Sequence, residues 1–429
     1  MAIATPGLEA RRAAVVALDA VLEHDRSLDA AWREAKVDRL KDRDAKFARL
    51  LVLTTLRRLG SIDAVIDRFV AKRPVGKNGL AVQIMRIAGA ELMALDGAAH
   101  AAVDIAVRLA KRQPETQRLS GMVNAVCRRL ADEGCRMFDE IDSEAVDTPA
   151  WLWERMKAAH GEPIARAIAA AHRHGAALDL MPARDAQSWV ERLGGALTPA
   201  GTLRLEGGSV TALDGYDEGE WWVQDAAATL PATLLGDVGG KRVLDLCAAP
   251  GGKTMQLAAM GADVTALDIS PPRMRRMREN LLRTRTSATV VIADALDWTP
   301  DGEFDAILLD APCSATGTIR RHPDLPHLKS GAVLSALTPL QDALMKRAWE
   351  WIGPGGVLVF ATCSLLPEEG EERIASFLGS HPDARVDPVE PGSGIGPEMI
   401  VDGMLRTLPC QWPDIGGLDG FFAARLRKE

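Results

Sequence analysis

The sequence predicts an α/β protein whose mostly parallel sheet is preceded by an all-α bundle and a small α+β adapter. Three observations support this prediction. Residues 8–130 carry apolar residues at helical spacing almost throughout, residues 136–222 mix helical and strand-like patterns, and residues 223–429 alternate strands with helices. Such alternation is typical of a parallel sheet covered by helices on both faces. We therefore expect three domains, at 1–135, 136–222 and 223–429.

Composition and cysteine usage indicate a soluble, cytoplasmic protein. Of the 429 residues, 47% are hydrophobic and 26% are charged, which is ordinary for a globular chain. Charged residues interrupt the first 25 positions, and no run approaches the roughly 18 apolar residues of a membrane span. The six cysteines show no Cys-x-x-Cys pair and no zinc spacing. We expect free thiols, no metal and no membrane, and the pattern gives no strong signal for a dimer, so we expect a monomer.

The N-terminal third is helical and basic. Residues 1–135 carry 23 Lys and Arg against 17 Asp and Glu, a net charge of +6, whereas the remaining residues carry 28 against 42, a net charge of −14. A basic segment on an acidic chain favours a polyanionic partner, but a solvated helical surface explains the charge equally well. Gly and Pro residues predict helix ends at 60–61, 74–76, 97 and 114. Helices are expected at 8–18, 45–59, 78–95, 99–112 and 119–130.

The adapter is rich in tryptophan. Five of the ten tryptophans, at positions 151, 153, 189, 221 and 222, lie there. Helices are expected at 149–159 and 162–173, before a Gly-rich, strand-like stretch at 193–219. Tryptophan can stack on nucleobases, but burial in a core is the commoner role and is favoured for most of these residues.

The C-terminal half supplies the sheet. Strands are expected at 242–246, 263–267, 289–293, 304–309, 356–361 and 421–426. Helices are expected between them at 224–235, 253–259, 271–285, 339–352 and 369–379. In this architecture ligands bind at the carboxyl ends of the strands, so the residues at those ends decide the function.

The first strand runs into a loop, Cys247–Thr254, and then into a helix. Gly251 and Gly252 lack Cβ atoms, so the backbone can bend sharply and approach a ligand closely. Taken alone, this stretch fits a plain turn, a phosphate loop or a cofactor loop. A phosphate loop requires glycine where Cys247 stands, and Pro250 removes an amide donor that such a loop would use. A nucleoside-triphosphate hydrolase is therefore the weaker alternative.

Acidic residues end the first four strands. Asp268 lies roughly 20 residues past the glycine loop, the usual position of a ribose-hydroxyl acceptor. Asp294 could accept the amino group of an adenine. Helix capping is the commoner explanation for any single Asp. The joint placement of Asp245, Asp268, Asp294 and Asp310 instead favours a nucleotide-type cofactor.

Two cysteines follow neighbouring strands, Cys313 after the fourth and Cys363 after the fifth. A metal pair lacks further ligands, and disulfides are rare in the cytosol. Covalent catalysis fits better, because a thiolate can add to an electron-poor carbon while a second group assists elimination. Cytosine C6 is such a carbon, and addition there makes C5 nucleophilic toward an activated methyl group. Chemistry alone leaves open which cysteine attacks.

These motifs resemble those of the Sun-type RNA cytosine-C5 methyltransferases, and within them the bacterial ribosomal RNA small subunit methyltransferase B group. The resemblance covers nearly the whole chain. It rests on Asp245–Thr254, on Asp310–Gly317 with Ile319–Asp324, on Thr362–Ser364 with Pro367–Glu369, and on Gly121–Asn124, Trp222–Asp225 and Gly420–Phe422.

The resemblance implies a NusB-like RNA-binding domain at 1–135. It also implies a Rossmann-like S-adenosylmethionine-dependent methyltransferase domain with a mostly parallel seven-stranded sheet at 223–429. It implies that small-subunit ribosomal RNA is the substrate, with another RNA as the alternative. Cys363 would be the nucleophile, Cys313 would promote product release, and Asp310 would lie by the methyl donor and the target base. The residues implied to bind the cofactor are Cys247, Ala248, Ala249, Pro250, Gly251, Gly252, Lys253, Asp268, Asp294 and Asp310.

Two positions depart from the family pattern. Residues 180–183, Leu-Met-Pro-Ala, replace a segment that usually contains Arg and Asn, which puts RNA docking by the adapter in doubt. Gly370 stands where Asn is common. Neither position touches the residues at the strand ends. Cys247 is interpreted as a packing residue, not as a third catalytic thiol.

Overall fold

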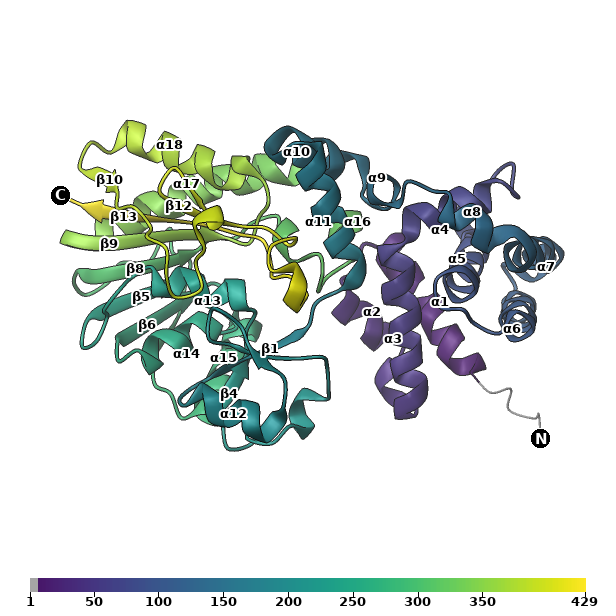
Figure 1. Cartoon of the computed structure of the whole chain (residues 1–429), viewed down its shortest axis with the longest axis horizontal. Helices are drawn as coiled ribbons and strands as arrows, with labels where there is room; N and C mark the ends of the chain where they lie inside the picture. Colours follow the sequence, from purple (N-terminus) through teal and green to yellow (C-terminus); the bar gives the residue numbers. More distant parts are fainter. Residues whose placement is uncertain (1–6) are drawn as a thin grey trace. The chain divides into compact units, whose positions relative to one another are not determined.

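The computed structural model describes residues 7–429, except the side chain of Lys77, and is shown in Figure 1. The chain forms two compact units. One, the helical unit, contains the residues up to Arg173 together with Arg321–Ser330, and the other, the sheet unit, contains His174–Arg320 and Gly331–Glu429. The boundary at Arg173 falls inside the segment 136–222 that the sequence presents as an adapter. The helices of this segment that precede the boundary belong to the helical unit, whereas its strands and the helix Ala186–Leu193 belong to the sheet unit.

The helical unit is organised around α5 (Leu80–Met93), which is buried over nearly its whole length. Helices α1, α3, α4, α6 and α7 all contact it. The expected helix end at Gly60–Ser61 is wrong, because both residues lie in the first turn of α4. The other helices are α1 (Leu8–Leu22), α2 (Leu28–Glu34), α3 (Asp42–Arg57), α4 (Leu59–Asp67), α6 (Ala99–Arg112), α7 (Ser120–Arg129), α8 (Cys135–Asp139), α9 (Ser143–Asp147), α10 (Ala150–His160) and α11 (Glu162–His174).

The segment Arg321–Ser330 joins the helical unit although it follows the fourth strand of the main sheet in sequence. It contains the short helix α16 (Leu325–Leu328). The Asp324 carboxylate accepts a hydrogen bond from the amide of Leu28, the first residue of α2, at 3.0 Å. The Trp151 indole donates to the carbonyl of Pro326 at 3.1 Å. Part of the fourth family motif is therefore built into the helical core.

A small antiparallel sheet opens the sheet unit, in the order β2 (Ala196–Leu197), β3 (Leu203–Leu205), β1 (Leu178–Pro182) and β4 (Trp221–Val223). Helix α12 (Ala186–Leu193) packs on it through Trp189. The expected burial of the tryptophans is confirmed, because Trp153, Trp189, Trp221 and Trp222 are each at most 8% exposed.

The main sheet has the order β11-β12-β13-β9-β8-β5-β6-β7, with β10 paired to β13. The neighbouring strands β9, β8, β5, β6 and β7 run parallel to one another. The pairs β13–β9, β12–β13, β11–β12 and β10–β13 are antiparallel. Among residues 7–429 this sheet has nine strands instead of the expected seven, because short strands are added at the edge formed by β13. The strands are β5 (Arg242–Leu246), β6 (Asp263–Asp268), β7 (Thr289–Ile292), β8 (Phe304–Asp310), β9 (Ile352–Thr362), β10 (Ala384–Val386), β11 (Ile400–Val401), β12 (Met404–Thr407) and β13 (Phe421–Lys428).

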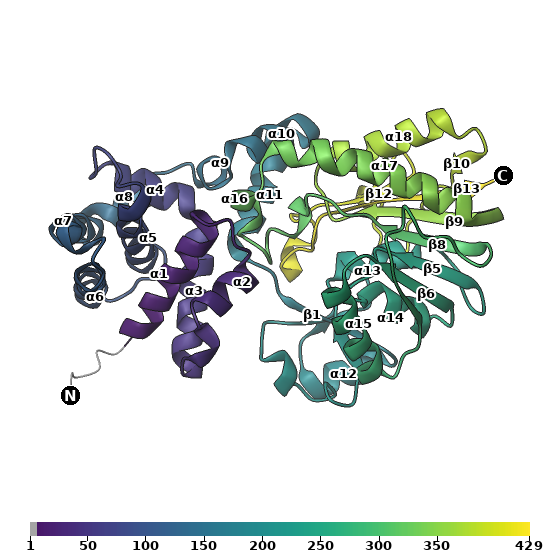
Figure 2. The same ribbon diagram turned by 180° about the vertical axis from the view of Figure 1, so that it is seen from behind.

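Helices cover both faces of this sheet, as Figure 2 shows. Alternate strand residues face opposite layers, so Val243 of β5 joins the core beneath α13 and α14, whereas Leu244 joins the core beneath α17 and α18. The expected parallel sheet between helical layers is confirmed. The helices are α13 (Ala226–Thr233), α14 (Gly252–Ala259), α15 (Pro271–Thr284), α17 (Leu334–Trp351) and α18 (Glu371–Ser380).

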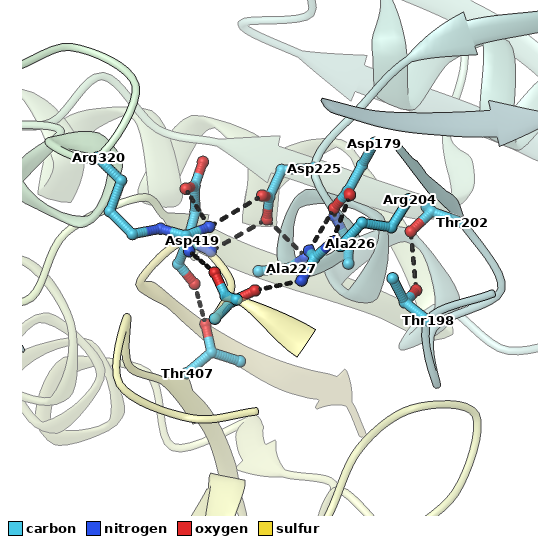
Figure 3. Close-up of polar contacts among 12 residues, drawn as sticks. Asp179, Thr198, Thr202, Arg204, Asp225, Ala226, Ala227, Arg320, Thr407 and Asp419 are labelled. Atoms are coloured by element: carbon cyan, nitrogen blue, oxygen red, sulfur yellow. Dashed lines mark hydrogen bonds and ion pairs between the residues drawn. The ribbon is translucent and has the colours of Figure 1, made fainter. Parts of the chain in front are cut away.

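Two buried arginines tie the sheet unit together (Figure 3). Arg320 lies 3.7 Å from the Asp225 carboxylate and 3.4 Å from that of Asp419. Arg204 of β3 forms two hydrogen bonds of 2.7 Å to Asp179 of β1 and donates to the carbonyl of Gly417 at 2.5 Å. These contacts join the small sheet, the start of α13 and the loop before β13 to the end of the segment that carries Cys313.

Candidate active site

A cavity of about 460 Å³ lies at the carboxyl ends of the parallel strands. Six residues singled out from the sequence line it: Cys247, Asp268, Asp294, Asp310, Cys313 and Cys363. Most of the apolar wall of the cavity is not predicted from the sequence. This wall includes Leu340 and Leu344 of α17. These two leucines carry no local signal, because only the packing of α17 against the sheet brings them to the cavity.

Asp268 is the last residue of β6, and three neighbouring groups hold its carboxylate in place. The amide of Ala249 donates to Oδ2 at 3.2 Å, and the amide of Ser270 donates to Oδ1 at 2.8 Å. Arg273 of α15 lies 3.3 Å from the same carboxylate. Asp294, after β7, accepts the amide of Leu296 at 2.9 Å. Both carboxylates thus have fixed positions on the cavity wall.

The donor set fits the S-adenosylmethionine implied by the resemblance. Carboxylates suit the ribose hydroxyls and the adenine amino group, and apolar side chains such as Leu267, Ala295 and Leu344 suit the faces of a purine. Asp268 and Asp294 stand at the ends of adjacent strands, β6 and β7. These two residues would hold the nucleoside part of the cofactor.

The loop between β5 and α14 carries its bend in two residues. Cys247 has φ 63° and Gly251 has φ 103°, both in the left-handed region. A Cβ added at Gly251 would lie 3.0 Å from Cγ of Met277, so the loop packs tightly against α15. Of the loop residues, only Cys247 lines the cavity. Contact of the other loop residues with the cofactor stays a prediction.

Cys247 behaves as a packing residue. Its side chain is half-buried and packs against the core beneath α17. Burial, reinforced by the nearby Asp268 carboxylate, raises the pKa of the Cys247 thiol. Because the thiolate is the reactive form of cysteine, this raised pKa argues against a catalytic role.

Lys253 reaches from α14 to the end of β8. Its Nζ lies 2.8 Å from Oδ2 of Asp310 and 5.1 Å from the centre of the Phe421 ring. Burial alone would lower the pKa of Lys253, but its pKa is raised, chiefly by Asp310 and also by Cys363. A buried cation therefore lies within electrostatic reach of both Asp310 and the Cys363 thiol.

Asp245 is the penultimate residue of β5 and is fully buried. Thr254 donates its hydroxyl to Oδ2 of Asp245 at 2.5 Å, whereas Oδ1 has no hydrogen-bond partner among the described residues. Burial raises the pKa of Asp245 to about 7. Asp245 supports the cofactor loop from beneath and is not one of the residues that line the cavity.

The two cysteines meet, because β8 and β9 are adjacent parallel strands. Sγ of Cys313 and Sγ of Cys363 lie 3.5 Å apart. The segment after Cys313 is anchored by a hydrogen bond from the amide of Gly317 to the carbonyl of Cys363 at 2.9 Å. The contact with Cys363 and burial raise the pKa of the Cys313 thiol, and Glu369 raises it further. Cys313 is thus held as a protonated thiol beside Cys363.

The helical unit has less free positive charge than its composition indicates. Arg57 is largely buried, and burial lowers its pKa. Several other arginines are held in ion pairs, namely Arg11 with Glu91, Arg58 with Asp147, Arg73 with Asp63, and Arg129 with Glu133. Exposed cations outside these pairs include Lys111, Arg118 and Arg128.

Residues 7–429 contain neither a metal-binding cluster nor a helix suited to cross a membrane. No group of three or more His, Cys, Asp or Glu side chains in this range is placed to hold a metal ion. No helix in this range has both the length and the hydropathy that a membrane span requires.

Known proteins match both units. Residues 232–427 match the family described as 16S rRNA methyltransferase RsmB/F, and residues 8–132 match the NusB family. The ribosomal RNA small subunit methyltransferase B of Photorhabdus laumondii is 31% identical, over 96% of this chain and 97% of its own. The protein of the same name from Erwinia tasmaniensis is 34% identical over the same shares.

Solved structures show the same fold. The crystal structure of PH0851 superposes with a TM-score of 0.79 over 99% of this chain and all of its own, at 23% identity. A methyltransferase homologue from Pyrococcus horikoshii, at 28% identity, covers 64% of this chain and 94% of its own with a TM-score of 0.55. Identity above 30% along almost the entire length of named relatives, together with both family matches, shows that this chain belongs to the RsmB/F family of 16S rRNA methyltransferases.

Proposed function

We propose that this protein methylates C5 of a cytosine in 16S ribosomal RNA by covalent catalysis, with S-adenosylmethionine as the methyl donor. The observation that carries the proposal is the pair of thiols, 3.5 Å apart, in the same cavity as Asp268, Asp294 and Asp310. One cavity would then hold both the cofactor and the reacting base. Family membership supports the substrate class, because the relatives are named for the small-subunit ribosomal RNA.

Cys363 is the proposed nucleophile, and its thiolate adds to C6 of a cytosine that is flipped out or single-stranded. The buried Lys253 ammonium lies within electrostatic reach of the Cys363 side chain. Bound S-adenosylmethionine supplies an electrophilic methyl group, which C5 takes. Asp310, which pairs with Lys253 and lines the cavity, contacts the methyl donor and the target base in this scheme.

Product release requires loss of the C5 proton and cleavage of the bond between Cys363 and C6. In the proposed step a base beside Cys313 accepts the C5 proton, the electron pair of the C5–H bond restores the C5–C6 double bond, and Cys363 leaves C6 as a thiolate. The Cys313 thiol assists this departure by donating its S–H to the leaving sulfur. This thiol contacts Sγ of Cys363, and its raised pKa keeps it protonated. A protonated Cys313 supports Cys363 as the attacking residue over Cys313.

Single cysteine variants test the scheme. We expect Cys363→Ala to abolish methylation of ribosomal RNA, because Cys363 supplies the sulfur of the adduct in this scheme. We expect Cys313→Ala to accumulate a covalent protein–RNA adduct, seen as a shifted band on a denaturing gel. Near wild-type activity of Cys363→Ala would refute the nucleophile assignment, and absence of the adduct in Cys313→Ala would refute the release role.

Two further measurements test the cofactor and the substrate. S-adenosylhomocysteine should raise the melting temperature and Mg-ATP should not, because the cavity fits a nucleoside with a methionine tail and the loop lacks a phosphate cradle. Bisulfite sequencing of ribosomal RNA from cells with and without the gene should show one protected cytosine that depends on the protein. Protection of a cytosine in a transfer RNA instead would identify the alternative RNA as the substrate. We accordingly propose that the protein acts in the cytoplasm, where ribosomal RNA is assembled into subunits.

A further inference from the structure

Glu369 is a fully buried carboxylate in the short turn Pro367–Glu369 that precedes α18. Both of its oxygens receive hydrogen bonds. Oε1 accepts the amide of Ser314 at 2.8 Å and the side-chain amide of Gln341 at 3.2 Å. Oε2 accepts the hydroxyl of Ser364 at 2.6 Å and also that of Ser314. All four donors are neutral groups.

The donors belong to the two segments that carry the cysteines. Ser314 follows Cys313 and Ser364 follows Cys363, so a single carboxylate is bonded to the residue after each thiol. A second bond joins the same segments, since the amide of Leu365 donates to the hydroxyl of Thr316 at 2.9 Å. The main chain of Glu369 is itself fixed, because Thr362 donates its hydroxyl to the Glu369 carbonyl at 3.0 Å.

We propose that Glu369 is the positioning residue of the cysteine pair: it joins the two segments and holds Sγ of Cys313 and Sγ of Cys363 3.5 Å apart. This inference rests on the proposed roles of the two cysteines. Hydrogen bonds to a charged acceptor are the strong ones, and a buried cluster of this kind fixes one arrangement of its members. After the contact with Cys363 and burial, the Glu369 charge adds to the rise in the pKa of the Cys313 thiol.

The contribution to rate follows from geometry. A displacement of about 1 Å between reacting groups can reduce a rate by about 100-fold. Glu369 does not line the cavity, so its replacement should leave the binding of the cofactor unchanged. The expected effect is therefore a loss of kcat at constant KM for S-adenosylmethionine. General destabilisation would instead lower the melting temperature without changing the turnover of the folded enzyme.

The test compares Glu369→Gln and Glu369→Ala with a matched control, Asp179→Asn. Asp179 is also fully buried in the sheet unit, but it pairs with Arg204 in the small sheet. Melting temperature, affinity for S-adenosylhomocysteine, and kcat with ribosomal RNA are measured below the melting point of every variant. We expect kcat to fall about 10-fold in Glu369→Gln and about 100-fold in Glu369→Ala. Asp179→Asn should melt earlier and retain wild-type kcat.

Serine variants carry the same test if the Glu369 variants do not fold. Ser314→Ala and Ser364→Ala each remove one hydroxyl donor, and each should lower kcat several-fold without changing affinity for S-adenosylhomocysteine. Wild-type kcat in folded Glu369→Gln, or in both serine variants, would overturn the inference. Cys363→Ala is assayed in parallel. If it is inactive while Glu369→Gln is fully active, only the positioning role fails, whereas an active Cys363→Ala refutes the cysteine roles themselves.

Discussion

Asp245 should make the stability of the sheet unit depend on pH. Its carboxyl group is fully buried in β5, and burial raises its pKa from the ordinary 3.8 to about 7. A pKa that is higher in the folded state than in the unfolded state stabilises the fold at low pH. This stabilisation is fully present below the unfolded pKa of 3.8 and is lost as the pH rises through about 7.

The size of the effect follows from the two pKa values. A difference of about 3 pKa units corresponds to about 4 kcal/mol in the free energy of unfolding. About 3 kcal/mol of this falls between about pH 5 and about pH 8. Asp245→Asn removes the titration but keeps an oxygen that can accept the Thr254 hydroxyl. The variant should therefore lack the loss that the wild type shows over this interval.

Urea unfolding at the two pH values measures the effect. The transition of the sheet unit is identified as the one that S-adenosylhomocysteine shifts to higher urea concentration. The buried amide of Asn costs stability at every pH, so the comparison uses the change with pH within each protein. Between about pH 5 and about pH 8, the wild type should lose about 3 kcal/mol more than Asp245→Asn. Equal losses in the two proteins would refute the argument that Asp245 is protonated in the fold.

Arg320→Met removes a cation shared by two buried carboxylates and should cost about 3–5 kcal/mol in urea unfolding, whereas Arg192→Met, which breaks an exposed ion pair, should cost less than about 1 kcal/mol. Equal costs would contradict the assignment. Gly370→Asn should cost about 1–3 kcal/mol, because a Cβ there would lie 2.8 Å from Cγ of Phe422, and Gly379→Asn, with open space around it, is the control. The triple variant Lys111→Gln, Arg118→Gln and Arg128→Gln should bind ribosomal RNA more weakly with a shallower salt dependence, measured by filter binding at several salt concentrations. An unchanged salt dependence of RNA affinity would show that these residues do not contact the RNA phosphates.

Much of the fold could be predicted from local patterns in the sequence. The strand at 242–246 and the helix at 99–112 have the predicted limits in the structure. Each shows an uninterrupted periodicity bounded by turn residues, so short-range information sufficed. Gly60 misled the prediction, because glycine is a helix breaker by propensity. Here a Cβ would lie 1.8 Å from the carbonyl oxygen of Val146, so the close approach of α9 requires glycine inside α4.

The meeting of the candidate site residues at one edge of the sheet could also be predicted. Adjacent parallel strands end at the same edge of a sheet, so residues that follow them must meet there. This rule brings Cys313 and Cys363 together, although 50 positions separate them. It also brings Asp268 and Asp294 to the same cavity. The chemical type of each residue and its place after a strand were sufficient evidence.

The sequence by itself determined the alternation of the central strands with their helices, the sharp loop after β5 and the residues at the strand ends. Tertiary structure alone decided that Arg321–Ser330 belongs to the helical unit, that many arginines of that unit are held in ion pairs, and that Glu369 connects the two cysteine segments. The physical reason is the range of the interactions. Periodicity reports contacts between near neighbours in the chain, whereas the bond between Ser314 and Glu369 joins residues 55 positions apart and leaves no periodic trace in either segment.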